Sequence, residues 1–157
     1  MREEYNSSGE KLQADRKYRR LKDEFFGKDG MPLWKQFIHH GDEQGFDIRY
    51  EGPDGAHVER IILQIGRKVV RYGNDRGSFT TDPGTPYSLL SMPFEELSLP
   101  YHEYIVLGEC EVLCIVLKGR VAPGFLSEGG AVQYYHEHTM RESIRMGILK
   151  EDWKWLK

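Results

Sequence analysis

Hydrophobic and polar positions follow two different patterns along this chain, and the change falls near residue 56. Before it, apolar residues recur at helical spacing from Ala14 to Phe25, while Lys and Arg crowd the other face. Ser7 and Glu10 offer a capping box in front of this stretch. The pattern predicts a solvated N-terminal helix broken by "GKDGMP", then a short helix in "LWKQFIHH" and a loop in "GDEQG".

After residue 56 the chain is rich in Val, Ile and aromatic residues, which predicts strands. "HVERIILQIGRKVVRYG" is expected to be strand with a turn or bulge at Gly66, "YHEYIVLGECEVLCIVLKGRVA" gives two strands meeting near Gly108 and Glu109, and "AVQYYHEH" one more. The Gly- and Pro-rich stretches "NDRGSFTTDPGTPY" and "PGFLSEGG" are expected to be loops, which often carry function.

A second capping box, Thr139 with Glu142, predicts a last short helix that Gly147 ends. The fold class is therefore α+β, with a mostly antiparallel, curved sheet and helical segments at both ends. The length of 157 residues suits one domain with its own core. We divide it into an N-terminal helical segment or linker (1–30) and the main domain (31–157).

Composition and charge narrow the class of protein. The net charge of -3 argues against a general nucleic-acid binder, which shows a basic excess. We see no apolar run long enough for a membrane span and no signal peptide, so we expect a cytosolic chain or part of a larger protein exported by other means. On a strand, Cys110 and Cys114 would lie about 13 Å apart. This is too far for a disulfide, so two buried free thiols are expected.

Few motifs of known chemistry occur. We find no phosphate-binding loop, no dinucleotide fingerprint and no "HExxH" or "GxSxG". Two pairs of histidines stand close together, but no third metal ligand follows by spacing, so we interpret them as surface residues and expect no metal. The pairs are His39 with His40, and His136 with His138.

Three polar residues stand at expected strand ends beside loops: Arg71 in "VVRYGNDRGSF", His102 in "PYHEYIVL" and Gln133 in "EGGAVQYY". An arginine there can present its planar fork to a phosphate or carboxylate. Each has a plainer explanation as well: a salt bridge for Arg71, a strand cap for His102, a bonded loop carbonyl for Gln133. Their common placement is what favours a site.

Taken together, these segments resemble the NAD glycohydrolase toxins named for the tuberculosis necrotizing toxin. The motifs that carry the resemblance are "RYGNDRGSF", "DPGTPY", "YHEYIVL", "VAPGFLSEGGAVQY" and the terminal helix with "GIL", in that order over residues 58–150. The resemblance implies a fold related to ADP-ribosylating toxins and hydrolysis of NAD between nicotinamide and ribose, without a metal or other cofactor. It implies catalytic roles for Arg71, His102 and Gln133, with Arg71 facing the phosphates. The substrate-binding residues expected beside them are Tyr72, Ser78, Phe79 and Phe125.

The chain departs from the family pattern near the expected nicotinamide pocket. Gly124 replaces an aromatic residue after Ala-Pro, "GGAV" shortens the glycine run, and Val70 replaces an acidic residue before Arg71. One alternative is an ADP-ribosyltransferase using Arg71, "SFTT" and the Glu109–Glu111 pair. Another is a binding module without catalysis, in which Gly124 and Ala131 reflect lost activity.

The resemblance also suggests partners and a setting. The expected ligand is NAD+ or NADP+, whose 2′-phosphate could meet Arg67, Lys68 or Arg76. A cognate immunity protein should protect the producing cell, and we expect neither nucleic acid nor membrane as a partner. The domain would belong to an exported effector that acts in the cytoplasm of a target cell.

Overall fold

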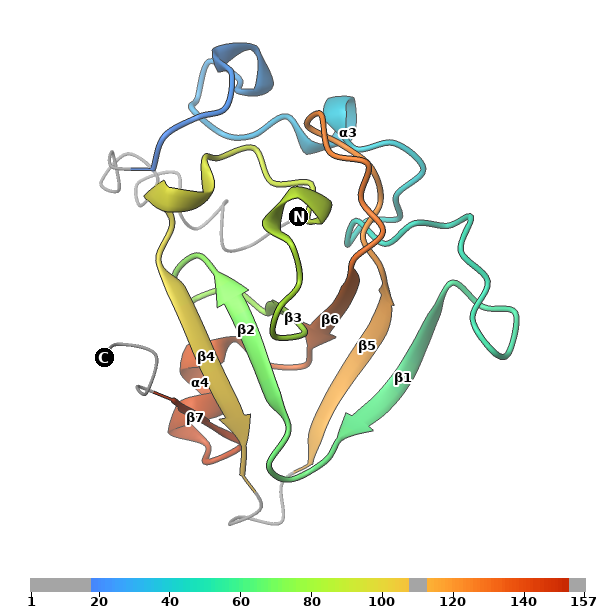
Figure 1. Cartoon of the computed structure of the whole chain (residues 1–157), viewed down its shortest axis with the longest axis vertical. Coiled ribbons are helices and arrows are strands. Elements are labelled where there is room, and N and C mark those ends of the chain that lie inside the picture. Colours follow the sequence, from blue (N-terminus) through green and yellow to red (C-terminus); the bar gives the residue numbers. More distant parts are fainter. Residues whose placement is uncertain (1–17, 108–112, 153–157) are drawn as a thin grey trace.

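A computed structural model describes residues 18–107 and 113–152 of the chain. Its centre is a seven-stranded sheet in the order β1-β5-β6-β3-β2-β4-β7, and every neighbouring pair is antiparallel (Figure 1). The predicted antiparallel α+β architecture is confirmed. The strands are β1 (Val58–Leu63), β2 (Lys68–Tyr72), β3 (Phe79–Thr81), β4 (Tyr101–Val106), β5 (Cys114–Arg120), β6 (Val132–His136) and β7 (Leu149–Glu151).

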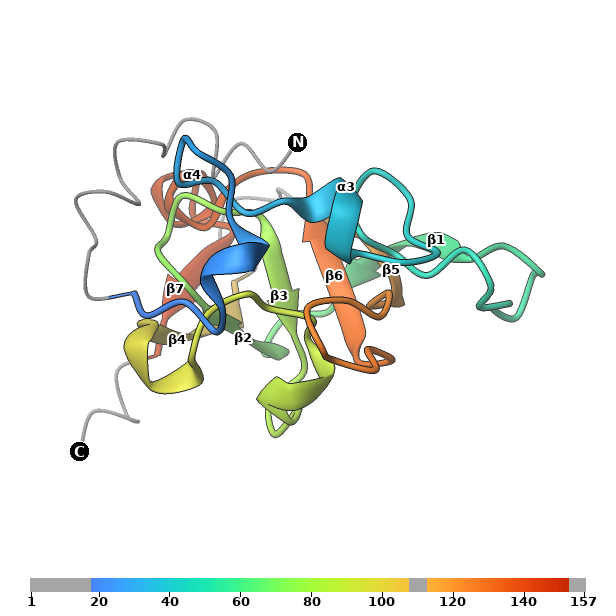
Figure 2. The ribbon, with the colours of Figure 1, turned by 90° about the horizontal axis from the view of Figure 1, so that it is seen from above.

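Short helices connect and cover these strands. Within residues 18–107 and 113–152 the α-helices are α3 (Trp34–Phe37) and α4 (Met140–Arg145), and the 3-10 turns are η1 (Asp23–Phe25), η2 (Tyr87–Leu89) and η3 (Glu96–Ser98). Helix α4 begins at the predicted capping box, where Thr139 and Glu142 exchange side-chain and backbone hydrogen bonds. Gly147 follows it with a positive φ of 76°, as predicted for a C-cap. Figure 2 shows α4 and η2 on opposite sides of the sheet.

The main core lies between α4 and one face of the sheet. Alternate strand residues point to that face, and their buried side chains pack with Met140 of α4 and Ile148 beyond it. The strand members of this cluster are Leu63, Val69, Tyr104, Val106, Cys114, Val116, Tyr134 and Leu149. The opposite face is therefore left for the loops and for residues 18–57.

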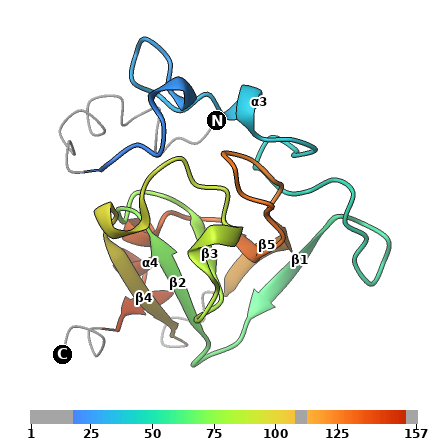
Figure 3. The same ribbon diagram turned by 45° about the horizontal axis from the view of Figure 1, so that its top comes forward.

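A second, aromatic core joins the segment before β1 to the loops at one end of the sheet (Figure 3). Phe25 packs edge-on against Phe125 with ring centres 5.2 Å apart, and Trp34 does so at 5.3 Å. The predicted N-terminal helix is wrong for its described part, because residues 18–26 form η1, two isolated β-bridges and irregular backbone. Their aromatic side chains turn into this core, and this packing overrides the helical spacing. The rest of that helix, with Ser7 and Glu10, lies outside the described residues.

Two strands were missed. Residues 79–81 were expected in a loop but form β3, which fills the gap between β2 and β6. Residues 149–151 form β7 on the free edge of β4. Both strands have only three residues, too few for an alternating pattern to identify. The strands β4 and β5 do not pair with each other, since β5 lies between β1 and β6. Their predicted meeting point near Gly108 and Glu109 lies outside the described residues.

Two predictions about single side chains had different outcomes. Cys114 is a buried free thiol, and burial raises its pKa to about 11, whereas Cys110 lies outside the described residues. His39 and His40 are exposed as predicted. His136 is not a surface residue: it is 3% exposed, and its Nε2 lies 2.6 Å from the Thr80 hydroxyl. The alternation of β6 turns His136 to the α4 side of the sheet, away from solvent.

Candidate functional site

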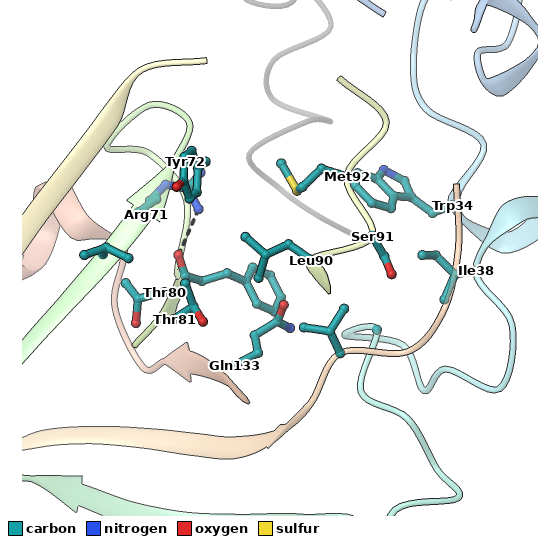
Figure 4. Close-up of a pocket in the computed structure, with 14 residues that line it drawn as sticks. Trp34, Ile38, Arg71, Tyr72, Thr80, Thr81, Leu90, Ser91, Met92 and Gln133 are labelled. Atoms are coloured by element: carbon teal, nitrogen blue, oxygen red, sulfur yellow. Dashed lines mark hydrogen bonds between the residues drawn. The ribbon is translucent and has the colours of Figure 1, made fainter. Parts of the chain in front are cut away.

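A pocket opens on the sheet face opposite α4, where three strands meet. The pairing places Val70 of β2 beside Thr81 of β3, and Thr81 beside Gln133 of β6, so their side chains share this face. The residues that line it, called the inner pocket below, are Trp34, Ile38, Gly45, Val70, Arg71, Tyr72, Phe79, Thr80, Thr81, Leu90, Ser91, Met92, Val121 and Gln133. Arg71 and Tyr72 stand at one end, and Trp34 and Ile38 at the other (Figure 4).

Arg71 ends β2 and holds the loop that follows it. Its side chain is buried, with Nε donating to the main-chain oxygen of Asn74 at 2.6 Å and Nη1 to that of Phe79 at 3.1 Å. A planar guanidinium can make both bonds at once because its donors point in fixed directions. Its charge also contributes, after burial, to lowering the pKa of His136 to about 3. The arginine thus fixes the loop and adds positive charge at this end of the pocket.

Two of the four predicted substrate-binding residues line the pocket. Tyr72 packs against Tyr87 and Tyr101 with ring centres 4.9 and 5.1 Å apart. Phe79 packs against Tyr135 at 4.8 Å. The structure does not bring Ser78 or Phe125 into the pocket lining. The main-chain oxygen of Ser78 accepts from His136, and Phe125 is buried in the aromatic core.

Gln133 lies in the middle of the inner pocket, between the Arg71 end and the Trp34 end (Figure 4). Its backbone is fixed on both sides, by Thr81 of β3 and Gly119 of β5. Its side-chain nitrogen is buried, and no described residue accepts a hydrogen bond from it. A buried amide nitrogen without an acceptor costs free energy unless a water or ligand bonds to it. The amide is therefore suited to bind a polar group that enters the pocket.

His102 sits opposite Arg71 in the β2–β4 pairing but is not part of the pocket lining. Its Nδ1 bonds to the carboxylate of Glu151 in β7, and its ring stacks on Tyr104 with centres 5.9 Å apart. Both partners lie toward the α4 side of the sheet. His102 thus links β7 to β4 beside the arginine, while its own ring is directed away from Gln133.

Two loops form one wall of the inner pocket. One contains Ser88 and Ser91, the other contains Ser127, and hydrogen bonds of Ser127 join them. Its hydroxyl donates to the Ser88 main-chain oxygen at 2.6 Å and accepts from the Ser91 N–H at 3.2 Å. Ser91 in turn donates to the Ala122 oxygen at 2.5 Å and has a positive φ of 52°. A non-glycine residue in this region stores strain, which is common beside functional sites. The loop that contains Leu90 and Met92 is therefore held against the loop that precedes β6.

Comparison with known proteins decides the family. The family model described as tuberculosis necrotizing toxin matches residues 62–151, more than half of the chain. The chain belongs to this family. Among curated proteins none matches it. A solved structure, that of Tse6 in complex with Tsi6, shares 20% identity with a TM-score of 0.39, over 51% of this chain and 65% of that one.

At Gly124 the chain departs from the sequence pattern of the toxin family. A Cβ built on Gly124 would lie 2.5 Å from Cδ1 of Ile38 and 2.5 Å from the main-chain oxygen of Phe37. Ile38 itself pairs with Gly124 in an isolated bridge and lines the inner pocket. The glycine therefore leaves no empty space, because residues 37–38 occupy the place that a larger side chain would take. Ala131 is likewise buried, and its oxygen accepts from Val121 at 2.9 Å.

Sequence reasoning missed the wall of the pocket formed by Trp34, Ile38, Leu90 and Met92. Trp34 and Ile38 precede the family motifs, and Leu90 and Met92 sit in a loop whose apolar residues show no period. The only available signal was an aromatic residue in a short amphipathic helix, which equally predicts core packing.

Other predicted residues fall elsewhere. Arg67 bonds to Asp82 at 2.7 Å and to the Tyr134 hydroxyl at 2.8 Å, and Lys68 pairs with Asp152 at 3.2 Å. Neither these two nor Arg76 lines the inner pocket. Glu109 and Glu111 lie outside the described residues. Within those residues, no three His, Cys, Asp or Glu side chains gather as metal ligands, and no helix is long and apolar enough to span a membrane.

Proposed function

We propose that this domain hydrolyses NAD+ to nicotinamide and ADP-ribose. The observation that carries the proposal is the meeting of Gln133 of β6 and Arg71 of β2 in one pocket, within a member of the tuberculosis necrotizing toxin family. Tyr72 and Phe79 add aromatic surface to the same pocket, on which a ring of the substrate can pack.

The reaction needs positioning more than strong acids or bases. Nicotinamide leaves as the C1′–N1 bond breaks, and the bonding electron pair stays on the ring nitrogen, which becomes neutral. Positive charge develops on the ribose, water attacks C1′, and the water loses a proton to the solvent. A residue that holds the ribose and directs the water therefore supplies catalysis.

Gln133 fits this role because an amide orients a water or a ribose hydroxyl without adding charge. Its buried nitrogen, for which the described residues supply no acceptor, gives it a donor for such a group. Arg71 would attract the pyrophosphate while keeping Phe79 in place through its hydrogen bond. His102 would act as a positioning residue, since it braces the strand pair that carries Arg71 and bonds to Glu151.

The biological setting follows from the reaction. Loss of NAD is harmful to any cell, so the producing cell would need an immunity protein, and one that covers the inner pocket would block access. We propose that the domain is part of an exported effector that acts in the cytoplasm of a target cell. NADP+ is the second candidate substrate.

Product analysis tests the proposal. Purified protein is incubated with NAD+, and nicotinamide, free ADP-ribose and protein-bound ADP-ribose are quantified for the wild type, Arg71→Ala, His102→Ala and Gln133→Ala. Hydrolysis predicts equal amounts of nicotinamide and free ADP-ribose, strongly reduced in all three variants. Nicotinamide with ADP-ribose attached to protein would favour the transferase instead. Binding of NAD+ without turnover in folded wild-type protein would favour the non-catalytic module.

A further inference from the structure

A second pocket adjoins the inner one at the end farthest from Arg71. It is lined only by residues between 34 and 45, and it shares Trp34, Ile38 and Gly45 with the inner pocket. Figure 4 shows Trp34 and Ile38 at the end of the inner pocket away from Arg71. All of its residues precede the part of the chain that the family model matches. This outer pocket is therefore a feature that the family match leaves unassigned.

The loop that builds the outer pocket is preformed. Oδ1 of Asp42 accepts from the N–H groups of Gln44 at 2.9 Å and of Phe46 at 3.0 Å. Phe46 is fully buried, and its ring lies over Gly119 of β5, where an added Cβ would come within 2.6 Å of it. The N–H of Ala122 donates to the main-chain oxygen of Gly45 at 2.9 Å. The loop is thus fixed to the sheet and its tip, Glu43, is exposed.

Charge differs between the two ends of the combined pocket. Two carboxylates, Asp42 and Glu43, and one ammonium, Lys35, line the outer pocket, while the buried guanidinium of Arg71 lies at the far end of the inner one. Oδ2 of Asp42 lies 2.8 Å from Nε2 of His57. Glu43 makes no ion pair with any residue that the structure describes. The outer end is therefore the more negative of the two.

We propose that the outer pocket receives the nicotinamide half of NAD+, with Trp34 and Glu43 recognising the cationic ring. This inference rests on the proposed function. NAD+ carries negative charge on its pyrophosphate and positive charge on its pyridinium ring. The pyrophosphate is therefore complementary to the Arg71 end of the combined pocket, and the ring to the Glu43 end. With the ribose at Gln133, the phosphates lie toward Arg71 and the ring toward Trp34. An aromatic face and a nearby carboxylate both attract a pyridinium cation.

The reaction removes the charge that this end attracts. Nicotinamide becomes neutral once the C1′–N1 electron pair stays on the ring, so the attraction of Glu43 acts on the substrate and is lost in the product. Glu43 consequently favours binding of NAD+ and leaves release of nicotinamide unopposed. Its loss should raise both KM and kcat, because a contact that is stronger in the ground state than in the transition state tightens binding and slows the chemical step.

The test measures binding of three small probes by NMR titration and does not require turnover. The probes are 1-methylnicotinamide, a pyridinium cation; nicotinamide, its neutral counterpart; and ADP-ribose, which carries the phosphates. The proteins are the wild type, Glu43→Gln, Glu43→Lys and, as a control for net charge, Glu51→Lys. Glu51 is exposed and lies outside both pockets.

We expect Glu43→Gln to weaken binding of 1-methylnicotinamide about two- to fivefold, the range of an exposed charge pair, and Glu43→Lys to weaken it further. Nicotinamide and ADP-ribose should bind within about twofold of wild type, and Glu51→Lys should change none of them. A larger change for ADP-ribose than for 1-methylnicotinamide, or no change for any probe, overturns the proposal. If the probes behave as expected but NAD+ is not hydrolysed, the proposed function fails while the binding site stands.

Discussion

Arg71 donates a hydrogen bond through Nη1 to the main-chain oxygen of Phe79 at 3.1 Å, so the end of β2 is joined directly to the start of β3. The same guanidinium holds Asn74 through Nε. One buried side chain therefore determines the course of the loop 73–78 and the position of the Phe79 ring in the inner pocket. An arginine at this position can therefore contribute to the shape of the pocket as well as to its charge.

Replacing Arg71 by Lys tests that double role. An ammonium keeps the charge but cannot reproduce the fork that bonds to two carbonyl oxygens in different directions. We expect the variant to lose about 1.5–3 kcal/mol of unfolding free energy, and kcat/KM for NAD+ to fall at least about tenfold because a misplaced site loses orientation. Urea denaturation and product assays measure both, with Arg76→Lys in the same loop as control. A fully active, equally stable Lys variant would show that charge alone matters.

Gly124 provides a second prediction. A methyl group at this position would lie 2.5 Å from the Phe37 oxygen and from Ile38. We expect Gly124→Ala to lower the unfolding free energy by about 1–3 kcal/mol, the usual range for overpacking. The midpoint of urea denaturation measures it. An unchanged midpoint would mean that the site has spare room and would revive the idea that Gly124 reflects a lost contact.

His136 predicts a pH dependence of stability. Burial, aided by Arg71, lowers its pKa to about 3 in the folded protein. In the unfolded chain it takes up a proton near pH 6.5. Its contribution to stability is therefore complete above pH 6.5 and is lost as the pH falls from there toward 3.

Between pH 7 and pH 5 the wild type should lose about 2 kcal/mol more unfolding free energy than His136→Gln, at about 1.36 kcal/mol for each pH unit below 6.5. Urea denaturation of both proteins at the two pH values gives this difference, and groups common to both cancel. Equal losses would show that His136 is protonated in the folded state.

Phe25 tests where the domain begins. We predicted that residues 1–30 form a helical segment or linker, yet the Phe25 ring is 3% exposed and packs against Phe37 and Phe125. We expect Phe25→Ala to lower the unfolding free energy by about 3–5 kcal/mol. Leu21→Ala, at an exposed side chain, is the control. A thermal unfolding curve that does not change for Phe25→Ala would support a dispensable linker.

The sequence predicted those parts of the fold in which local signals and tertiary structure agree. Strands β2 and β6 and the capping box at Thr139 have strong local patterns, and all formed as expected. Strand β3 could not be predicted because three residues show no alternation and its place depends on β2 and β6. The segment containing Phe25 was misjudged because its apolar spacing suits either a helix or an aromatic core.

The candidate site was likewise only partly predictable. Arg71, Tyr72, Phe79 and Gln133 share one pocket, as their placement at strand ends and the family motifs suggested. Trp34 and Ile38 reach it from outside those motifs, through contacts that depend on how the chain folds back. His102 was grouped with them because it stands at a strand end and in a family motif, but its ring bonds to Glu151 and stacks on Tyr104, toward the α4 side of the sheet, and does not line the pocket.

The most direct test of the account is the rate of NAD+ cleavage by Gln133→Ala beside Gln64→Ala, an exposed glutamine outside the pocket. Nicotinamide and free ADP-ribose are followed by chromatography, with folding confirmed by circular dichroism. We predict that the wild type and Gln64→Ala release both products at equal rates, and that Gln133→Ala slows release at least about a hundredfold, the loss seen when one preorganised hydrogen-bonding group is removed from an active site. Wild-type rates in a folded Gln133→Ala variant would contradict the central claim.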